Sequence, residues 1–305
     1  MATTTLQASN SMLCNGKCRS KARLDGKTAV VTGGNNGIGF ETSLELLRRG
    51  ARVIVACRSV ERGQSAAERL RAAVSDNAEV RVVRLDLASL KSVKKCAEEI
   101  LTTEPIIHLL INNAGTIVGE HKMTEDGYEM TFQTNHLAHF LLTALLLNRI
   151  KESSPSRIIT VSSDTHAKGI VKFDDLHGTN SYDAFTAYSQ SKLCNILFSL
   201  ELQQKLQGSG VTVYALNPGT VNTKFVDDVP GFFGVIVSLI RWTFKSPKQG
   251  AQTSIHCTVD PQLTEQSGLY YTNCKLTNPS KRARDANVAA ELWQFSEKLV
   301  RPYLH

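Results

Sequence analysis

The second half of the chain contains residues that could move a proton to or from a substrate oxygen. Tyr188 and Lys192 lie four residues apart in "YSQSK", and the apolar run "RIITVSS" ends at Ser162 and Ser163. Side chains four residues apart share one face of a helix, so we expect the Lys192 ammonium to lower the pKa of the Tyr188 phenol from about 10. Such a pair could protonate a carbonyl oxygen or deprotonate an alcohol. On its own, a Tyr and a Lys at this spacing often match by chance.

A glycine-rich stretch near the start of the chain could hold a phosphate. "TGGNNGIGF", Thr32 to Phe40, separates the strand-like "TAVV" from the helix-like "ETSLELLRRG". Gly33, Gly37 and Gly39 would allow a tight turn, close approach of a pyrophosphate and close packing of the helix on the strand. The helix start would offer free N–H groups to the anion. Glycine can also serve a strand–helix turn for steric reasons alone, but the position between a first strand and a first helix favours a dinucleotide site.

These residues need a scaffold, and the rest of the chain alternates short β-branched runs with longer helical patterns. Strands are predicted at 27–33, 51–57, 79–87, 107–115, 157–163, 211–219 and 268–274, and helices at 37–50, 60–75, 90–101, 132–150, 187–207 (amphipathic) and 288–300. This alternation implies crossover connections and a parallel sheet with helices on both faces. We therefore predict a doubly wound α/β fold of about seven strands, in a single domain of residues 25–305 that follows a flexible tail of residues 1–24.

The motifs together resemble the short-chain dehydrogenase/reductase family, from about Leu24 to the C-terminus. The glycines have the spacing Gly-x-x-x-Gly-x-Gly, and "NNAG" and "YSQSK" follow in order. "ACRS", "TNHLAHF", "VSSDTH", "AYSQSKLCN" and "NPGTV" are similar to the retinol dehydrogenase branch. The resemblance implies a Rossmann fold and an alcohol–carbonyl oxidoreductase. It implies that Ser163 bonds the substrate oxygen beside Tyr188 and Lys192, and that Asn135 completes a proton relay through water. Because side chains alternate along a strand, Ser162 is expected to face the fold.

The residues after the second predicted strand favour NADP(H). An NAD site has a carboxylate there for the ribose 2′-hydroxyl, whereas this chain has Cys57 and Arg58, with Arg62 one turn later. A guanidinium pairs well with a 2′-phosphate; the alternative is a surface arginine that caps the next helix. The resemblance implies that the cofactor is bound by Gly33, Asn35, Asn36, Gly37, Ile38, Gly39, Arg58, Asp86, Leu87, Asn113, Ala114, Gly115, Tyr188, Lys192, Pro218, Gly219, Val221 and Thr223.

Composition narrows the possible partners and locations. The chain has 305 residues, a net charge of +7 and seven cysteines. Its basic residues are dispersed and no nucleic-acid motif accompanies them, so we expect no nucleic-acid partner. An odd number of scattered cysteines favours a reducing compartment. We expect an intracellular protein, in the cytoplasm or peripherally on an intracellular membrane. A mitochondrial presequence is the alternative for the first 24 residues, which are basic and also contain Cys14 and Cys18.

Two further expectations concern metals and oligomeric state. His136 and His139 lie three residues apart without a zinc motif or a nearby carboxylate set, so we predict no metal site and interpret them as packing or hydrogen-bonded histidines. Members of the resembled family often pair through their long helices, which leaves a homodimer as an open expectation.

The segment at 224–248 is predicted to cover the substrate. It is apolar from Val229 to Phe244 and has Arg241, Lys245 and Lys248 at its end. An amphipathic lid of this kind would suit a lipophilic alcohol or aldehyde such as retinal and an anionic membrane surface; a core helix is the alternative. The alternatives for function are a broad carbonyl or steroid reductase and a non-catalytic NADPH-binding sensor.

Overall fold

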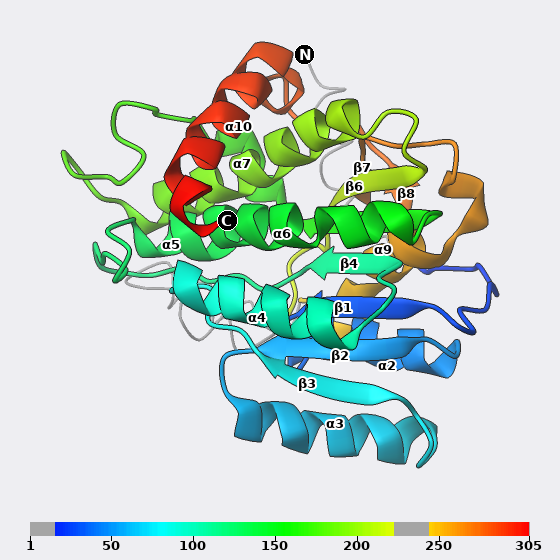
Figure 1. Cartoon of the computed structure of the whole chain (residues 1–305). Coiled ribbons are helices and arrows are strands. Elements are labelled where there is room, and N and C mark those ends of the chain that lie inside the picture. Colours follow the sequence, from blue (N-terminus) through cyan, green and yellow to red (C-terminus); the bar gives the residue numbers. More distant parts are fainter. Residues whose placement is uncertain (1–15, 223–243, 305) are drawn as a thin grey trace.

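The computed structural model describes residues 16–222 and 244–304, and its centre is an eight-stranded sheet with the order β3-β2-β1-β4-β5-β6-β7-β8 (Figure 1). All neighbouring pairs from β3 to β7 are parallel, and β8 is antiparallel to β7. The strands are β1 (Thr28–Thr32), β2 (Arg52–Cys57), β3 (Val80–Arg84), β4 (Leu109–Asn112), β5 (Ser156–Val161), β6 (Val211–Asn217), β7 (Leu269–Thr272) and β8 (Lys275–Leu276). The predicted doubly wound α/β fold is confirmed.

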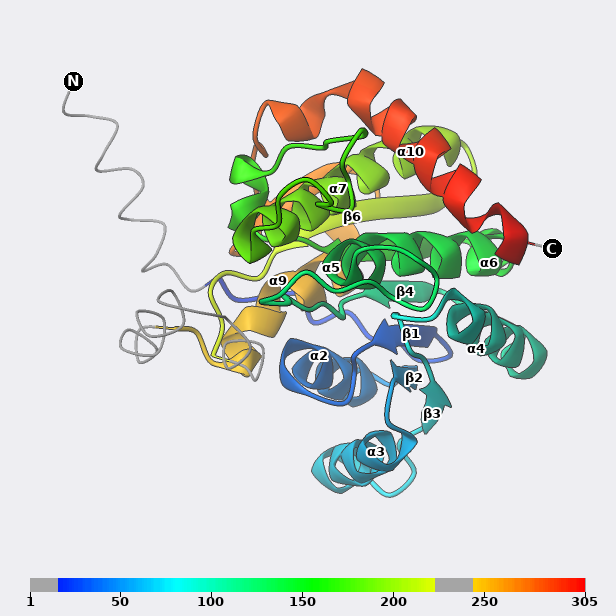
Figure 2. The same cartoon turned by 90° about the vertical axis from the view of Figure 1, so that its left-hand side faces the viewer.

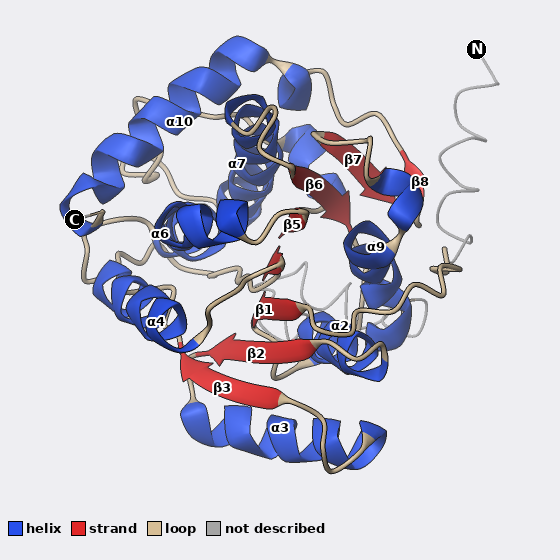
Figure 3. Ribbon diagram, turned by 45° about the vertical axis from the view of Figure 1, so that its right-hand side comes forward, coloured by secondary structure: helices blue, strands red, loops and turns tan. Residues whose placement is uncertain are grey.

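Helices cover both faces of the sheet (Figures 2 and 3). They are α2 (Gly37–Arg48), α3 (Val60–Val74), α4 (Leu90–Thr103), α5 (Met130–Phe132), α6 (Ala138–Glu152), α7 (Ala184–Lys205), α9 (Pro247–Val259) and α10 (Ala286–Val300). Successive strand residues face opposite layers, as the two-residue period requires. In β1, Val30 belongs to the core that includes residues of α4, α6, α7 and α10, while Ala29 and Val31 belong to the core that includes residues of α2, α3 and α9.

The final strand was predicted as one run at 268–274, and the structure corrects this to a hairpin. Asn273 and Cys274 have φ of 54° and 57° and turn the chain from β7 into β8. Residues other than glycine enter this left-handed region uncommonly, with asparagine among the exceptions. Asn-Cys is therefore a weaker turn signal than Asn-Gly, and the eighth strand was missed for that reason.

Residues 16–24, which the sequence assigned to a flexible tail, lie along the domain in the structure. The Arg49 guanidinium in the turn after α2 donates to the backbone carbonyls of Ser20 and Ala22. The Cys18 amide donates to Gln252 on α9, and Leu24 is buried. In this structure these residues therefore pack on the domain.

The predicted lid falls almost entirely on residues 223–243, which lie outside the described part of the chain, as does the predicted cofactor residue Thr223. Its last residues lead into α9, which begins with a capping box between Ser246 and Gln249 and Pro247 in its first turn. Lys245 was predicted as a basic residue at the lid rim. Its ammonium is instead half-buried and donates to Asn273 and to the Pro218 carbonyl.

Helix α7 was predicted to be amphipathic, but it is buried on almost every side. The C-terminal helix α10 lies across it (Figure 1). Trp293 of α10 stacks on Phe198 of α7 at 5.9 Å and meets Phe140 of α6 edge-on at 4.8 Å. A homodimer paired through the long helices could not use the part of α7 that α10 covers. Among residues 16–222 and 244–304, no helix is both long and apolar enough for a membrane crossing.

Candidate active site

The predicted site residues gather where the strand order reverses. Strands β2 and β4 flank β1, so the loops after β1 and β4 leave the sheet side by side. In open α/β sheets this crevice at the carboxyl ends of the strands is where ligands bind. The loop after β1 carries the glycines, and the loop after β4 carries "NNAG".

The glycine loop has the geometry of an anion cradle. Gly37 has φ of 55°, and a methyl group on Gly39 would lie only 2.4 Å from the Gly33 carbonyl oxygen. The N-cap of α2, Asn36, makes no side-chain cap bond in the described part of the chain, and the first turn contains no acid. By contrast, α3, α4, α7, α9 and α10 are each capped by a side chain. The free N–H groups at α2 and the close backbone packing fit a bound pyrophosphate.

The hydroxyl of Thr32 joins the two loops. It accepts hydrogen bonds from the amides of Asn113 (2.9 Å) and Ala114 (3.0 Å), and the Asn113 side chain donates back to the Thr32 carbonyl. Sequence analysis quoted Thr32 as part of the glycine stretch but gave it no role. The loop after β6 reaches the start of α2. Its residue Val221 packs against Gly250 of α9, and Ile38 of α2 lies beside them.

Three exposed arginines lie at the ends of β2 and β3. Arg58 follows β2, Arg62 lies in the first turn of α3, and Arg84 ends β3 with its Cα paired to Cys57. The pKa of the nearby Glu61 carboxyl is lowered, chiefly by a backbone hydrogen bond and by Ser59. The positive charges of Arg62 and Arg84 lower it further. Arg84 was not predicted to lie here, because only the strand pairing brings it to this edge. Glu61 is a carboxylate at an edge where none was expected. The positive charge at this edge fits a 2′-phosphate.

The remaining predicted cofactor residues line the same edge. Asp86, after β3, accepts a hydrogen bond from the Ala88 amide, and the carbonyl of the buried Leu87 accepts one from Gln133. After β6, the Gly219 amide donates to Asn217, and Lys245 holds the Pro218 carbonyl.

Ser163 and Tyr188 meet in the structure. Ser163 lies beside the Tyr188 phenol and acts to lower its pKa, while Ser163 Oγ donates to Asp164 (3.1 Å) and accepts from the Thr165 amide (3.2 Å). Ser162 faces the fold and donates to the Lys192 carbonyl, as strand alternation predicted. A hydroxyl has one hydrogen to donate, so Ser163 must release Asp164 before it can donate to a substrate oxygen. Sequence analysis did not consider Asp164.

Lys192 and Asn135 meet across Gly115. A methyl group on Gly115 would lie 3.2 Å from Lys192 Nζ and 3.3 Å from Asn135 Oδ1. Asn135 is fully buried, accepts from the Thr116 amide (2.7 Å) and donates to Ser191 (2.9 Å). It lies in a π-helical turn, Gln133–Leu137, within the predicted continuous helix. Such turns are frequent at functional sites.

The pKa of Tyr188 is raised in the chain alone, rather than lowered. Burial raises the pKa of Tyr188 above its usual value, and Asp164 adds to this. Lys192 Nζ donates to the Val161 carbonyl and lies 5.5 Å from the centre of the Tyr188 ring, and burial lowers the pKa of Lys192 to about 8. Desolvation disfavours the charged form of each group, and in the chain alone it determines the direction of both pKa values. That Lys192 lowers the tyrosine pKa stays a prediction.

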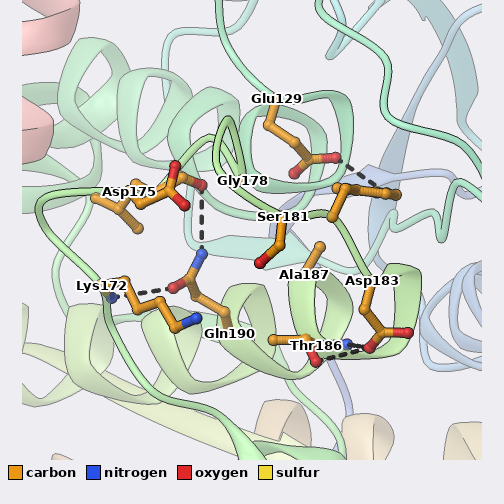
Figure 4. A pocket seen from close by; sticks show the side chains of 11 residues that line it. Glu129, Lys172, Asp175, Gly178, Ser181, Asp183, Thr186, Ala187 and Gln190 are labelled. Carbon is orange, nitrogen blue, oxygen red and sulfur yellow. Dashed lines mark hydrogen bonds between the residues drawn. The ribbon is translucent and has the colours of Figure 1, made fainter.

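A polar pocket lies beside the start of α7 (Figure 4). It is lined by Glu129, Lys172, Asp175, Leu176, Gly178, Ser181, Tyr182, Asp183, Thr186, Ala187 and Gln190. Its carboxylates are engaged, because Glu129 and Asp183 cap helices and Asp175 binds Thr179. Tyr188 does not line it, so we interpret this pocket as a seam between loops. Within the described residues no group of His, Cys, Asp and Glu could hold a metal ion.

The comparisons with known proteins agree with this arrangement. A family model described as short chain dehydrogenase matches residues 27–230. This chain belongs to the short-chain dehydrogenase family. Members of the family use nicotinamide dinucleotides, and the chain is an oxidoreductase similar to the retinol dehydrogenases.

Two curated relatives and one solved structure show how far the similarity extends. Retinol dehydrogenase 12 of Mus musculus is 45% identical over 93% of this chain and 90% of its own length. Retinol dehydrogenase 13 of Homo sapiens is 46% identical over 93% of this chain and 88% of its own. An uncharacterised protein of Mycobacterium paratuberculosis has 33% identity and a TM-score of 0.76, covering 94% of this chain and 98% of that structure. The similarity therefore includes the whole short-chain dehydrogenase domain.

Proposed function

We propose that this short-chain dehydrogenase interconverts a lipophilic alcohol and its carbonyl with NADP(H), and that its substrate is retinol or retinal. The observation that carries the proposal is that Ser163, Tyr188 and the buried Lys192 lie together after β5, with Lys192 Nζ 5.5 Å from the centre of the Tyr188 ring. The substrate class is supported by the retinol dehydrogenases to which the chain is about 45% identical. The choice of NADP(H) is supported by the start of α2, which has no side-chain cap among the described residues, and by the arginines near the end of β2.

The residues of the chain divide the chemistry among them. A bound nicotinamide dinucleotide supplies or accepts the hydride. Tyr188 gives its phenolic proton to the substrate oxygen in reduction and takes it back in oxidation. Ser163 donates a hydrogen bond to the same oxygen and so stabilises the charge that develops on it. Lys192 holds a positive charge near Tyr188, and Asn135 fixes the loop around Gly115.

The direct test is a steady-state assay of the purified protein. NADPH oxidation is followed with all-trans-retinal, a ketosteroid and a short aldehyde, and NADP⁺ reduction with all-trans-retinol. We expect the highest kcat/KM with retinal. Turnover of the steroid or short aldehyde with none of retinal would favour the carbonyl or steroid reductase, and NADPH binding without turnover of any substrate would favour the sensor.

Arg58→Asp should reduce or reverse the preference for NADPH over NADH. The substitution removes a guanidinium and adds a carboxylate near the 2′-phosphate. Charge-assisted hydrogen bonds contribute about 1.5–3 kcal/mol, so we expect the ratio of kcat/KM for the two cofactors to fall about 10- to 100-fold. Arg301→Asp, at an exposed arginine after α10, is the matched control. Equal activity of the parent with both cofactors would refute the assignment of Arg58.

A further inference from the structure

His139 was interpreted from the sequence as a packing or hydrogen-bonded histidine, but both its ring nitrogens join parts of the active site. Nδ1 lies 3.1 Å from the backbone oxygen of Asn135, and Nε2 lies 2.9 Å from the hydroxyl of Thr32. The ring is 2% exposed. It therefore lies between the π-helical turn that carries Asn135 and the end of β1, where the glycine loop begins.

The direction of each hydrogen bond follows from the groups themselves. A carbonyl oxygen can only accept, so Nδ1 carries the hydrogen and donates to Asn135. Burial lowers the pKa of His139 to about 4, so the ring is neutral near pH 7 and Nε2 accepts from the Thr32 hydroxyl. The Thr32 oxygen in turn accepts from the amides of Asn113 and Ala114.

We propose that His139 is a positioning residue that holds the nucleotide loops and the Asn135 turn in a fixed relation. One ring connects the turn beside Lys192 and Gly115 with the Thr32 hydroxyl and, through it, with the "NNAG" backbone. The inference rests on the proposed function. It assigns an effect on cofactor binding to Nε2 of His139 and an effect on turnover to Nδ1.

Two conservative variants separate the two sides. The amide of asparagine reaches about as far as Nδ1 of histidine, and the amide of glutamine about as far as Nε2. His139→Asn can still donate to the Asn135 carbonyl but loses Thr32, whereas His139→Gln can still accept from Thr32 but loses the Asn135 carbonyl.

We expect the two variants to fail differently. His139→Asn should raise the Kd for NADPH, measured by its fluorescence without substrate, about three- to tenfold, and leave kcat at saturating NADPH within about twofold. His139→Gln should leave this Kd within about twofold and lower kcat about three- to tenfold. Thr32→Val removes the hydroxyl and with it the acceptor of the Asn113 and Ala114 amides, so it should raise the Kd at least as much as His139→Asn. His139→Asn should add no further loss in the Thr32→Val background.

His136 provides the matched control. It lies in the π-helical turn that carries Asn135, is 1% exposed and bonds Ser296 on α10 rather than the nucleotide loops. His136→Gln should lower Tm while kcat and the NADPH Kd stay within about twofold. Equal losses of Kd and kcat in His139→Asn and His139→Gln, or a change in Tm alone, would overturn the proposal.

Hydrogen exchange tests the same inference without cofactor or activity, so failure of the proposed function is distinguishable from failure of this one. In His139→Leu, the amides of Asn113 and Ala114 should exchange at least about tenfold faster, because the Thr32 hydroxyl that accepts them keeps only the longer hydrogen bond (3.4 Å) to the Ile111 carbonyl. The amides of the β5–β6 pair, on the other side of β4, should be unchanged. Unchanged exchange at 113–114 would show that His139 does not hold this loop.

Discussion

Tyr188→Phe should lower turnover by about 10²–10⁴-fold while NADPH still binds. The substitution keeps the ring, whose centre lies 5.5 Å from Lys192 Nζ, and removes only the phenolic hydroxyl with its transferable proton. The measurement is kcat with saturating retinal and NADPH, together with the NADPH Kd. We expect the Kd to stay within a few-fold of the parent, because the hydroxyl is only one of many predicted cofactor contacts and the others remain.

Tyr214→Phe is the control for loss of a buried tyrosine hydroxyl. Tyr214, on β6, is fully buried, and its hydroxyl donates to the Leu263 carbonyl. Its removal should lower Tm and leave kcat nearly unchanged. If Tyr188→Phe kept most of its turnover, another group would have to donate the proton and the proposed mechanism would fail.

The fold and the strand-end residues could be predicted because the sequence pattern carries them directly. Apolar runs stop where the chain leaves the sheet, which placed Gly33, Asn113 and Ser163 at the same edge. The π-helical turn could not be predicted, because the apolar pattern continues through it without a break. The β7–β8 hairpin was missed because its turn is Asn-Cys rather than a glycine pair.

What the sequence could not show depends on distant partners and on depth of burial. Thr32 and His139 lie 107 residues apart and meet only because β1 and the helix after β4 pack together. His166 also has a distant partner: its Nδ1 faces the Ser163 carbonyl, and its Nε2 accepts from the Ser280 amide, 114 residues away. The spacing of Tyr188 and Lys192 gives a shared helix face but not the desolvation that determines the pKa of each group.

Lys192→Met should abolish most turnover and, at neutral pH, increase the free energy of unfolding. Lys192 is 3% exposed, and burial lowers its pKa from 10.5 to about 8. Below pH 8 the lysine is charged in both the folded and the unfolded chain, and the folded protein bears the full cost of the buried charge. A shift of this size corresponds to on the order of 3 kcal/mol, from which the lost hydrogen bond to the Val161 carbonyl subtracts.

The pH dependence of the free energy of unfolding tests whether the buried charge of Lys192 causes this difference in stability. Between about pH 8 and 10.5 the folded lysine is neutral while the unfolded one is still charged, so the unfolded state binds more protons and stability rises with pH. Relative to Lys192→Met, the parent should therefore gain stability across this window, measured by urea unfolding in a Tyr188→Phe background that removes the neighbouring phenol. Lys205→Met, at a half-exposed lysine of the same helix, should show no such gain. If the difference in the free energy of unfolding between the parent and Lys192→Met stayed constant from pH 7 to 10.5, burial would not lower the pKa of Lys192.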